Sequence, residues 1–417
     1  MTSSAQRQLR ILYLTHYFPP EVNAPAVRVS QFAQAWSAGG HQVTVVTGFP
    51  NHPAGVIPPE YRGKIFQREE TAGAQVLRGY IYAAPNRGFA RRILNYLSFM
   101  VSAIIIGVLR SGKQDLVIAT SPQFFVAIAG YIVSRIKRIP FVFEVRDLWP
   151  EEIVAVGAMK RGTVIRMLER IEAFLYRKAA LIVAVAEGTI AVLTARGIPR
   201  ERLALIPNAV DFERFAQAQD DHEIRNAHEL NGHFLVSYIG TLGMAHNLHT
   251  VLDSAARLRC HDDIRFLIVG DGAERENLVA YSRAQKLDNV TFVPQQSRTR
   301  VAEYYAASDV CLVPLRKTEL FTKNIPSKIY EVMAAGKPIV IGTNGESRRL
   351  VEGAEAGIAV APEDADDLAA KIVYLAKHRD ESRRLGANGR AFAERCCDYR
   401  VRARDYLAVL QPLVEQE

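Results

Sequence analysis

The sequence has few cysteines and no set of side chains spaced to hold a metal ion. Its four cysteines show no C-x-x-C spacing within 417 residues, which argues against a disulfide scaffold and predicts a reducing compartment. Asp364 and Asp366 have D-x-D spacing, but they open a helical pattern, in which aspartate caps the helix. We therefore predict no metal site. The cysteines are Cys260, Cys311, Cys396 and Cys397.

Motifs of several enzyme classes are also absent. No Ser-His-Asp or nucleophile-elbow pattern is present, and the G-x-G-x-x-G expected after the first strand of a dinucleotide-binding domain is missing. This argues against an NAD enzyme, and no cofactor is predicted. The apolar run near the N-terminus is too short for a signal peptide and lacks a small-residue cleavage site, so the sequence predicts a cytosolic chain.

The charge of the chain indicates an anionic partner. The formal net charge is +8 and the pI is about 9.3. Lysine and arginine are spread widely, without a long basic arm or a nucleic-acid motif, so we predict no nucleic acid partner. Anionic small molecules or an acidic membrane surface fit this distribution better.

Length and hydrophobic content predict at least two domains. Single cores usually stop growing at about 250 to 300 residues, whereas this chain has 417 residues, 49% of them hydrophobic. Short apolar β-branched runs alternate with helical patterns in two series, which is typical of doubly wound parallel sheets. We predict an α/β fold with two Rossmann-like domains facing a cleft. The predicted domains are 1–209 and 210–398, with 399–417 as a C-terminal helix that packs back on the first domain.

The two series are separated by a polar stretch, Asp211–Gly232, which is predicted to be the linker. A loop rich in Pro and Gly is expected at Pro50–Arg68. In the first series we expect strands at 10–16, 42–48, 74–82, 115–120, 141–147, 180–186 and 203–208, and helices at 26–38, 93–109, 124–137, 163–178 and 188–196. In the second series we expect strands at 234–240, 264–270, 290–294, 310–315, 338–343 and 357–362, and final helices at 364–394 and 399–413.

The stretch Val313–Thr343 is the most informative in the chain. Ser327 is a favourable N-cap for a short helix that Gly336 ends. Free N–H groups at a helix start favour phosphate, Lys328 would add a positive charge, and Glu331 would accept hydrogen bonds from sugar hydroxyls. The alternative is that Lys328 is solvated and Glu331 merely completes the first helical turn.

Three other loops of the second domain follow predicted strands. YIGTLGMAHNL would bring backbone N–H groups close to an anion, with partial positive charge from its histidine. VGDG would contact a ribose or base, and VTFVPQQ would leave backbone groups free to contact a base edge. The alternatives are glycines needed only for turn geometry and apolar residues that belong to the core. The donor-side candidates in these loops are Gly240, Thr241, His246, Gly270, Asp271 and Val293.

The first domain contains one unusual charged segment, EVRDLWPEE. Arg146 and Asp147 end a buried strand-like run, and burying an unpaired charge is costly. Either the two residues pair with each other or they act in catalysis. In the earlier segment HYFPPEVNAPAVR, Arg28 either faces the cleft or is solvated, and solvation is the default expectation.

The segment Ile93–Leu109 is apolar on nearly every face. Arg87, Arg91 and Arg92 precede it, and Arg110 and Lys113 follow it. It falls short of the roughly 20 residues that a membrane span needs. It is therefore either a buried helix or a helix partly exposed to lipid, with its arginines on headgroups. We favour partial exposure and predict a membrane surface contact through 87–113.

A series of motifs resembles one known family nearly end to end. In order they are YFPPE, GHQVTVVT, NYLSF, EVRDLWPE, LERIEAFLYRKAALIVAVAE, IPNAVD, YIGTLG, VGDG and PSKIYEVMAAGKPIV. They resemble the retaining glycosyltransferases of the GT-B fold, family 4, and within it the WbuB-like or WcaI-like enzymes of bacterial surface-polysaccharide synthesis. The resemblance implies a nucleotide sugar, usually UDP-linked, held chiefly by the second domain.

The resemblance also implies roles for individual residues. Glu331 is similar to the carboxylate that binds the donor ribose, Ser327 and Lys328 would lie by the diphosphate, and Gly240-Thr241 would form a phosphate loop. Asp147, with Arg146, falls where many relatives have a catalytic or acceptor-contacting residue. The acceptor-side candidates in the first domain are His16, Glu21 and Arg28.

The sequence departs from the family pattern at several positions. Lys323 stands where the first of two glutamates is usual, and Glu319 is nearby but out of register. Thr241 and His246 occupy a loop in which many relatives have Arg and Lys, so Lys323 and Lys328 are candidates to supply that charge. Asn23-Ala24-Pro25-Ala26 replaces the usual paired glycines.

These observations predict a metal-independent, retaining transferase that is cytoplasmic and peripheral at the inner face of the membrane. It would move a sugar, with an N-acetylated amino sugar or a deoxy sugar as candidates, from a UDP-sugar to a polyprenyl-diphosphate-linked saccharide of an O-antigen, capsule or exopolysaccharide. The alternatives are a nucleotide-sugar epimerase of the same fold, or a regulator that binds nucleotide sugar without catalysis.

Overall fold

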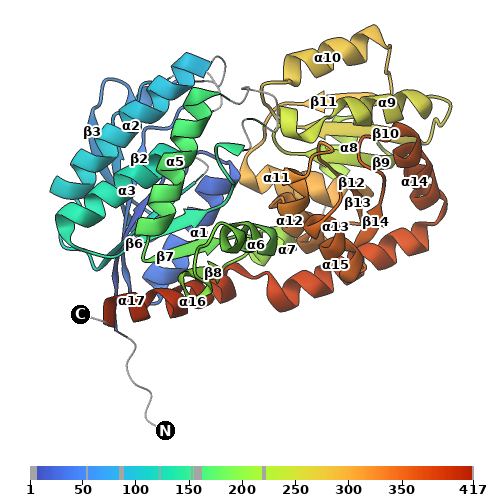
Figure 1. The fold of residues 1–417 in the computed structure, drawn as a ribbon. Helices are drawn as coiled ribbons and strands as arrows, with labels where there is room; N and C mark the ends of the chain where they lie inside the picture. Colours follow the sequence, from blue (N-terminus) through green and yellow to red (C-terminus); the bar gives the residue numbers. More distant parts are fainter. Residues whose placement is uncertain are drawn as a thin grey trace. The chain divides into compact units, whose positions relative to one another are not determined.

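The structure is a computed structural model that describes residues 7–52, 55–83, 89–121, 124–151, 154, 162–217 and 222–415. The chain divides into two compact units (Figure 1). Unit 1 comprises residues 1–207 and 399–417, and unit 2 comprises residues 208–398. Each unit is a layered α/β domain built on its own sheet, so the α/β Rossmann-like prediction is confirmed.

Unit 1 contains an eight-stranded sheet that is parallel except where β3 and β4 pair antiparallel. Most residues of its inner strands are apolar and buried, as expected of strands covered on both faces. Across the sheet the order is β3 (Phe66–Thr71), β4 (Ala74–Gly79), β2 (Gln42–Gly48), β1 (Arg10–Leu14), β5 (Leu116–Thr120), β6 (Phe141–Val145), β7 (Leu181–Ala184) and β8 (Leu203–Leu205).

Helices cover both faces of this sheet. One face packs against α1 (Ala24–Ala38), α16 (Tyr399–Leu410) and α17 (Pro412–Glu415). The indole N–H of Trp36 in α1 donates to the carbonyl of Ala403 over 2.9 Å, which ties the C-terminal helix to unit 1. The other helical elements are α2 (Phe89–Leu109), α3 (Phe124–Lys137), α5 (Thr163–Lys178), α6 (Glu187–Ala195), η1 (Pro59–Tyr61) and η2 (Arg200–Arg202).

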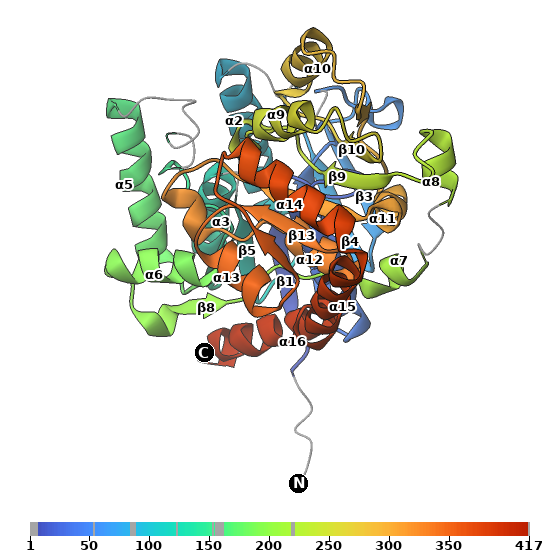
Figure 2. The ribbon, with the colours of Figure 1, turned by 90° about the vertical axis from the view of Figure 1, so that its right-hand side faces the viewer.

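Unit 2 contains a six-stranded, wholly parallel sheet. Figure 2 shows α9 and α10 on one side of it and α12, α13 and α15 on the other. The strand order is β11 (Val290–Val293), β10 (Ile264–Val269), β9 (Phe234–Ile239), β12 (Val310–Pro314), β13 (Ile339–Gly342) and β14 (Gly357–Ala359). The first face carries α9 (His249–Arg257), α10 (Arg275–Ala284) and α14 (Ala365–Lys377). The second carries α7 (Phe212–Gln217), α8 (His222–Ala227), α11 (Arg298–Ala307), α12 (Lys328–Ala334), α13 (Glu346–Gly353) and α15 (Arg379–Cys396).

Two segments that were expected to be irregular contain regular structure. The polar stretch 211–232 is not a plain linker, because it forms α7 and α8, whose residues Phe215 and Ile224 are buried in the core of unit 2. The expected loop at 50–68 runs into an edge strand, β3. The charged side chains of β3, such as those of Arg68 and Glu70, suit an edge strand. The strand forms because it pairs with β4, not because its sequence has an apolar pattern.

The chain passes between the units twice, and residues near the start and the end of unit 2, at these two crossings, lie side by side. Val210 forms an isolated parallel bridge with Asp398, and its N–H donates to the carbonyl of Cys397 over 2.9 Å. On the unit 1 side, Arg28 donates to the carbonyls of Ile206 and Pro207, each over 2.8 Å. The chain segment that leaves unit 1 is therefore held by a buried arginine.

Candidate functional site

The donor-side candidates gather at the carboxyl ends of the parallel strands of unit 2. The loop after β9 and the loop after β10 lie against each other, because the N–H of Leu242 donates to the carbonyl of Asp271 over 2.9 Å. Gly240 has φ of +143° and Gly270 has φ of +148°, and a Cβ atom on Gly270 would overlap the carbonyl oxygen of Gly240. Glycine is required here for both backbone conformation and close approach.

Lys328 is the first residue of α12, and its ammonium is enclosed. Nζ lies 3.7 Å from the ring centroid of Tyr238, and a Cβ atom on Gly240 would lie 2.9 Å from Nζ. Among the described residues Nζ has no hydrogen-bond partner. Burial lowers the pKa of Lys328 to about 7, although Glu331 acts in the opposite direction. The alternative of a solvated Lys328 is therefore wrong.

Ser327 does not cap the helix as predicted. Its backbone is already helical, with φ −58° and ψ −27°, and its side chain makes no cap hydrogen bond. An N-cap needs an extended conformation to turn its oxygen back toward the first N–H groups. Instead, the backbone carbonyls of Pro326 and Ser327 accept from the N–H groups of Ile329 and Tyr330, each over 3.1 Å.

His246 supplies no positive charge, contrary to the prediction. Burial and the nearby Lys328 ammonium lower its pKa to about 3, so the imidazole is neutral at physiological pH. Nδ1 lies 3.3 Å from the carbonyl oxygen of Pro314, and since a carbonyl only accepts, Nδ1 carries the proton. His246 is thus oriented as a neutral hydrogen-bonding group.

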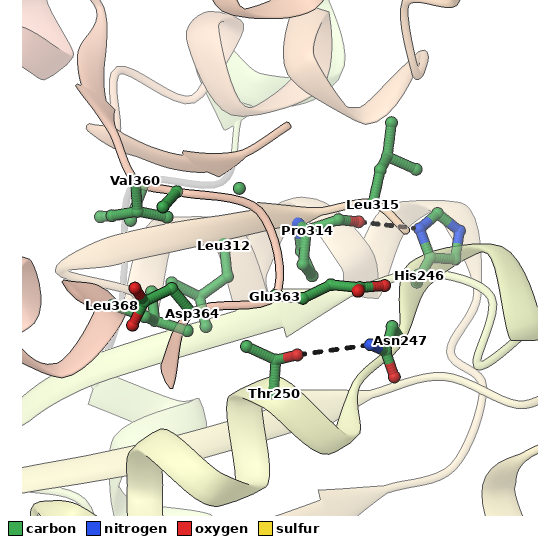
Figure 3. A pocket seen from close by; sticks show the side chains of 13 residues that line it. His246, Asn247, Thr250, Leu312, Pro314, Leu315, Val360, Glu363, Asp364 and Leu368 are labelled. Atoms are coloured by element: carbon green, nitrogen blue, oxygen red, sulfur yellow. Dashed lines mark hydrogen bonds between the residues drawn. The ribbon is translucent and has the colours of Figure 1, made fainter. Parts of the chain in front are cut away.

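A small pocket lies beside His246, at the carboxyl ends of β12 and β13 (Figure 3). Asn247 and Thr250 line it from the segment after β9, and Val360 and Glu363 line it from the loop after β14. The Glu363 carboxylate accepts from the N–H of Lys317 over 3.2 Å. The pocket therefore lies between three loops that follow strands of the same sheet.

Glu331 is held by two residues that the sequence reasoning missed. Arg214 of α7 contacts one carboxylate oxygen at 3.1 Å, and the Tyr305 hydroxyl of α11 donates to the other over 3.3 Å. Glu331 therefore does more than complete a helical turn. The sequence contains only a weak signal for the role of Arg214, because Arg214 is one of many charged residues in a polar stretch.

The remaining donor-side candidates differ in exposure. Lys323 in η4 (Leu320–Lys323) pairs with Glu319 at 3.2 Å, and both side chains contact solvent. The Asp271 side chain is exposed and accepts from the N–H of Gly272 over 2.7 Å. Val293 is a buried core residue whose carbonyl accepts from Gly270 over 3.0 Å. The Val293 carbonyl is therefore not free to contact a base, and a base contact by the other backbone groups after Phe292 stays a prediction.

Unit 1 contains a buried charged cluster beneath the candidate Arg146–Asp147 segment. Glu144, the fourth of the five residues of β6, is fully buried and pairs with Arg28 at 3.1 Å. It also accepts from the hydroxyls of Tyr13 over 2.9 Å and Thr120 over 2.7 Å. The expectation of a solvated Arg28 is therefore wrong, because a buried carboxylate needs an enclosed cation.

Arg146 lies at the carboxyl end of β6 and is nine-tenths buried. Its N–H donates to the Ser121 hydroxyl over 2.7 Å, and the N–H of Asp147 reaches the same oxygen over 3.3 Å. Within the described residues, Nε and Nη1 of Arg146 have no hydrogen-bond partner. Burial and the like charge of Arg28 lower the pKa of Arg146 below its usual value. Arg146 is thus a constrained cation at a strand end.

His16 and Glu21 follow β1 and are both buried. The amide oxygen of Asn95, in α2, lies 3.0 Å from His16 Nε2, which therefore carries the proton. Burial lowers the pKa of His16 to about 3, and it raises the pKa of Glu21 to about 7. Glu21 accepts from the N–H groups of Asn51 over 3.1 Å and His52 over 3.0 Å. Asn51 and Asn95 were not predicted as partners of these residues. For Asn95 a signal exists, because a single Asn within an apolar helix indicates a buried polar contact.

Both halves of the chain match glycosyltransferase families. Residues 23–209 match the family described as Glycosyl transferase 4-like domain, and residues 220–392 match Glycosyl transferases group 1. The chain belongs to the GT-B glycosyltransferases.

Relatives of this glycosyltransferase include WcaI of Escherichia coli strain K12, named as a colanic acid biosynthesis glycosyl transferase. It is 25% identical over 404 residues, which cover 94% of this chain and 97% of WcaI. A GDP-mannose-dependent alpha-mannosyltransferase of Mycolicibacterium smegmatis is 25% identical over 385 residues, or 92% of each chain.

Solved structures show the same fold. HepE of Anabaena, in complex with UDP and glucose, has a TM-score of 0.74 and 18% identity, covering 97% of this glycosyltransferase and 99% of HepE. Sucrose-phosphate synthase of Thermosynechococcus elongatus has a TM-score of 0.79 and 20% identity, covering 99% of this chain and all (100%) of that one.

The apolar helix α2 of this glycosyltransferase has 21 residues, so the expectation that it falls short of a membrane span is wrong. It is partly exposed in the structure, and its contact with lipid stays a prediction. Among the described residues one helical segment, Arg91–Leu109, is long and apolar enough to cross a membrane, with a mean hydropathy of 1.8 and 33% of it buried. Leu94, Val101, Ile105 and Leu109 are each more than half exposed and recur at helical spacing. Arg87 lies outside the described residues.

Proposed function

We propose that this glycosyltransferase is a metal-independent, retaining enzyme that transfers a sugar from a UDP-sugar to a lipid-diphosphate-linked saccharide during cell-surface polysaccharide synthesis. The relative WcaI, matched over nearly the whole chain, is named for colanic acid biosynthesis. Unit 2 would hold the donor and unit 1 the acceptor. The observation that carries the proposal is the enclosed ammonium of Lys328 beside the Gly240 loop, which has no hydrogen-bond partner in the described part of the chain.

This arrangement suits a departing diphosphate. When the bond between sugar and phosphate breaks, negative charge develops on the diphosphate and positive charge on the anomeric carbon. The Lys328 ammonium and the N–H groups of the loop at Gly240–Thr241 would stabilise the negative charge, and a buried cation does so more strongly than a solvated one. The anomeric carbon would resemble the oxocarbenium ion of glycoside hydrolysis.

A uridine nucleotide is the proposed donor carrier. HepE, of the same fold, was solved with UDP and glucose, whereas one relative is named as GDP-mannose-dependent. A thermal-shift screen with UDP, GDP and their sugars decides between the bases, because a ligand that binds only the folded state raises the melting temperature. A larger shift with GDP than with UDP would reject the uridine assignment.

Glu331→Ala is expected to weaken UDP binding about 10-fold or more, because hydrogen bonds between neutral hydroxyls and a charged group contribute about 1.5 to 3 kcal/mol. Isothermal titration calorimetry with UDP measures the effect. Glu319→Ala is the matched control, since the Glu319 side chain is 88% exposed and pairs with nearby Lys323. Unchanged UDP affinity in Glu331→Ala contradicts the donor-site assignment.

Diphosphate binding is expected to take up a proton at Lys328 above neutral pH. The pKa of Lys328 is about 7 in the unliganded protein, and a bound diphosphate would raise it. At pH 8 the free amine is mostly neutral, so UDP binding should take up close to one proton, and UDP affinity should fall as the pH rises above about 7. Calorimetry at pH 8 in buffers of different ionisation enthalpy measures this uptake. An uptake near zero contradicts the proposed contact.

We also propose that the protein binds the inner surface of the cytoplasmic membrane through α2. The exposed apolar side chains of α2 are flanked by the exposed arginines Arg91 and Arg92 before them and by Arg110 and Lys113 after them. Apolar side chains would enter the headgroup boundary while the cations contact anionic lipids, at about 1 kcal/mol for each cation near the surface.

The double variant Arg91→Ala/Arg92→Ala is expected to bind vesicles of phosphatidylglycerol and phosphatidylcholine about 30-fold more weakly than the unmodified protein, because it removes two cations worth about 1 kcal/mol each. Co-sedimentation at about 0.1 M salt measures binding. Lys317→Ala/Lys377→Ala removes two exposed lysines of unit 2 and serves as the control. Equal binding by the two double variants argues against α2 as the docking helix.

A second candidate is a regulator that binds nucleotide sugar without catalysis. The observation in its favour is Lys323, which stands where the family has its first glutamate and is paired with Glu319 on the surface. Such a protein would bind UDP-sugar normally and lack turnover with every lipid-diphosphate acceptor. Turnover with one such acceptor rejects it.

A further inference from the structure

Residues from two other helices contact the two carboxylate oxygens of Glu331. Arg214 Nη2 lies 3.1 Å from Oε1, and the Tyr305 hydroxyl lies 3.3 Å from Oε2. The three side chains come from α7, α11 and α12, so this contact joins segments that are 117 residues apart in the sequence.

The two residues that hold Glu331 are themselves fixed. The Arg214 side chain is only 10% exposed, and its guanidinium lies 4.6 Å from the ring centroid of Phe215. Phe215 and Tyr305 are both buried, with ring centroids 6.1 Å apart. Burial, followed by the nearby Glu331 carboxylate, raises the pKa of Tyr305 well above its usual value. Its hydroxyl is therefore a permanent donor.

Glu331 retains capacity for further hydrogen bonds. An ionised carboxylate offers about four acceptor positions, and Arg214 and Tyr305 each occupy one. The Glu331 side chain is still 25% exposed, so the other positions are accessible from solvent. A carboxylate with one position on each oxygen that no described residue occupies is matched to two adjacent hydroxyl groups, as in the 2′,3′-diol of a ribose.

A second carboxylate in the same unit, Asp309, is partly buried and is also held by arginine, but it makes more contacts within the protein than Glu331 does. Asp309 precedes β12, at the amino edge of the sheet, and contacts Arg225 at 2.9 Å and Arg379 at 3.2 Å. It also accepts from the N–H of Leu235 over 2.7 Å. Protein groups therefore occupy most of the capacity of Asp309, as expected for a structural pair.

We propose that Arg214 and Tyr305 are positioning residues that orient Glu331 toward both ribose hydroxyls of the nucleotide, and that they thereby set a preference for ribonucleotides over deoxyribonucleotides. The inference rests on the proposed donor site. Arg214 prevents Glu331 from rotating away, and Tyr305 fixes the plane of the carboxylate. A rotating carboxylate would accept from one hydroxyl at a time.

The test compares the affinities of UDP, 2′-deoxy-UDP and 3′-deoxy-UDP by calorimetry. The unmodified protein should prefer UDP over the deoxy analogues by about 10-fold or more, since each lost hydrogen bond to a charged group is worth about that factor. Arg214→Ala should reduce this ratio to about 3-fold or less, mainly by weakening UDP, and Arg214→Lys should restore part of it. Tyr305→Phe should reduce the ratio less and preserves the core.

Arg225→Ala is the matched control, because it removes a similar, partly buried pair between an arginine and a carboxylate in the same unit. It should lower thermal stability without changing the ratio between UDP and deoxy-UDP. A merely structural role for Arg214 predicts the same behaviour for Arg214→Ala, and that result overturns the inference. So does an unmodified protein without preference for UDP. If Arg214→Ala does not fold, an unchanged ratio in Tyr305→Phe is decisive against the inference.

The UDP-binding results distinguish a failure of this inference from a failure of the proposed function. If Glu331→Ala leaves UDP affinity unchanged, the donor site itself is wrongly assigned. If Glu331→Ala weakens UDP and Arg214→Ala leaves the ratio unchanged, only the positioning role of Arg214 is rejected.

Discussion

Replacing Lys328 with methionine is expected to lower kcat about 100- to 1,000-fold, because removing one preorganised group that stabilises a developing anion has costs of this size. The same change should leave the melting temperature unchanged or raise it. An enclosed ammonium with a pKa of about 7 lies in a site that disfavours its charge, and methionine fills similar space without that cost. Activity and stability should therefore change in opposite directions.

The sign of the pH effect follows from the lowered pKa. The native state disfavours protonated Lys328, so its destabilising effect is fully present below about pH 7 and disappears as the pH rises toward the unfolded lysine value of about 10.5. The stability advantage of Lys328→Met should therefore shrink between pH 7 and pH 10.

Turnover assays and thermal denaturation of the variant measure these effects. Lys317→Met is the control, since Lys317 is exposed on the loop after β12 and should change neither quantity. A variant that keeps full activity would remove Lys328 from the donor site. A variant that loses both activity and stability would identify Lys328 as a structural residue.

Replacing Glu144 with alanine is expected to destabilise unit 1 by about 3 to 5 kcal/mol, the usual cost of leaving a buried partner charge uncompensated. Glu144 is fully buried, Arg28 is nearly so, and Arg28 also holds the carbonyls of Ile206 and Pro207. The substitution leaves Arg28 and Arg146 buried together without a negative charge between them.

Tryptophan fluorescence during denaturation by urea reports this loss for unit 1 alone, because the two tryptophans of the chain, Trp36 and Trp149, both lie in unit 1. Asp405→Ala breaks a partly exposed pair with Arg402 in α16 and should cost less than about 1 kcal/mol. A loss below this level for Glu144→Ala contradicts the structural role of the cluster.

The acid dependence of this effect also has a definite sign. Burial alone would raise the pKa of Glu144, but the cations Arg28 and Arg146 outweigh it, so the pKa is lowered. The stabilisation by Glu144 is therefore present above the pKa of an unfolded carboxyl group and is lost as the pH falls through the lower folded value. The difference between the unmodified protein and Glu144→Ala should shrink in acid.

Most regular elements could be predicted from the sequence because their signals are local. The strand Gln42–Gly48 and the helices Phe124–Lys137 and Thr163–Lys178 have the predicted limits, since apolar runs and helical periodicity define them without reference to the rest of the chain. The short helices at Phe212–Gln217 and His222–Ala227 were not predicted. They are polar overall, and they form because Phe215 and Ile224 are buried in the core of unit 2.

In the candidate site, too, residues with a local sequence signal were predicted and residues that depend on tertiary contacts were not. Lys328 and Glu331 were identified because a helix start after a loop has a recognisable spacing. Arg214 was not, since nothing in its own segment indicates that it meets a residue 117 positions later. Glu144 and Asn95 were also missed, although one carboxylate or amide within an apolar element must find a partner when it is buried.

The sequence by itself determined the two α/β series, the glycine-rich loops at strand ends and the place of the lysine that starts α12. These depend on patterns among neighbouring residues. Only the tertiary structure decided that the lysine is enclosed by Tyr238 and Gly240, that His246 is neutral and that Arg28 is buried on Glu144. The physical reason is that charge states and ion pairs depend on desolvation and on partners distant in the chain, which only folding brings together.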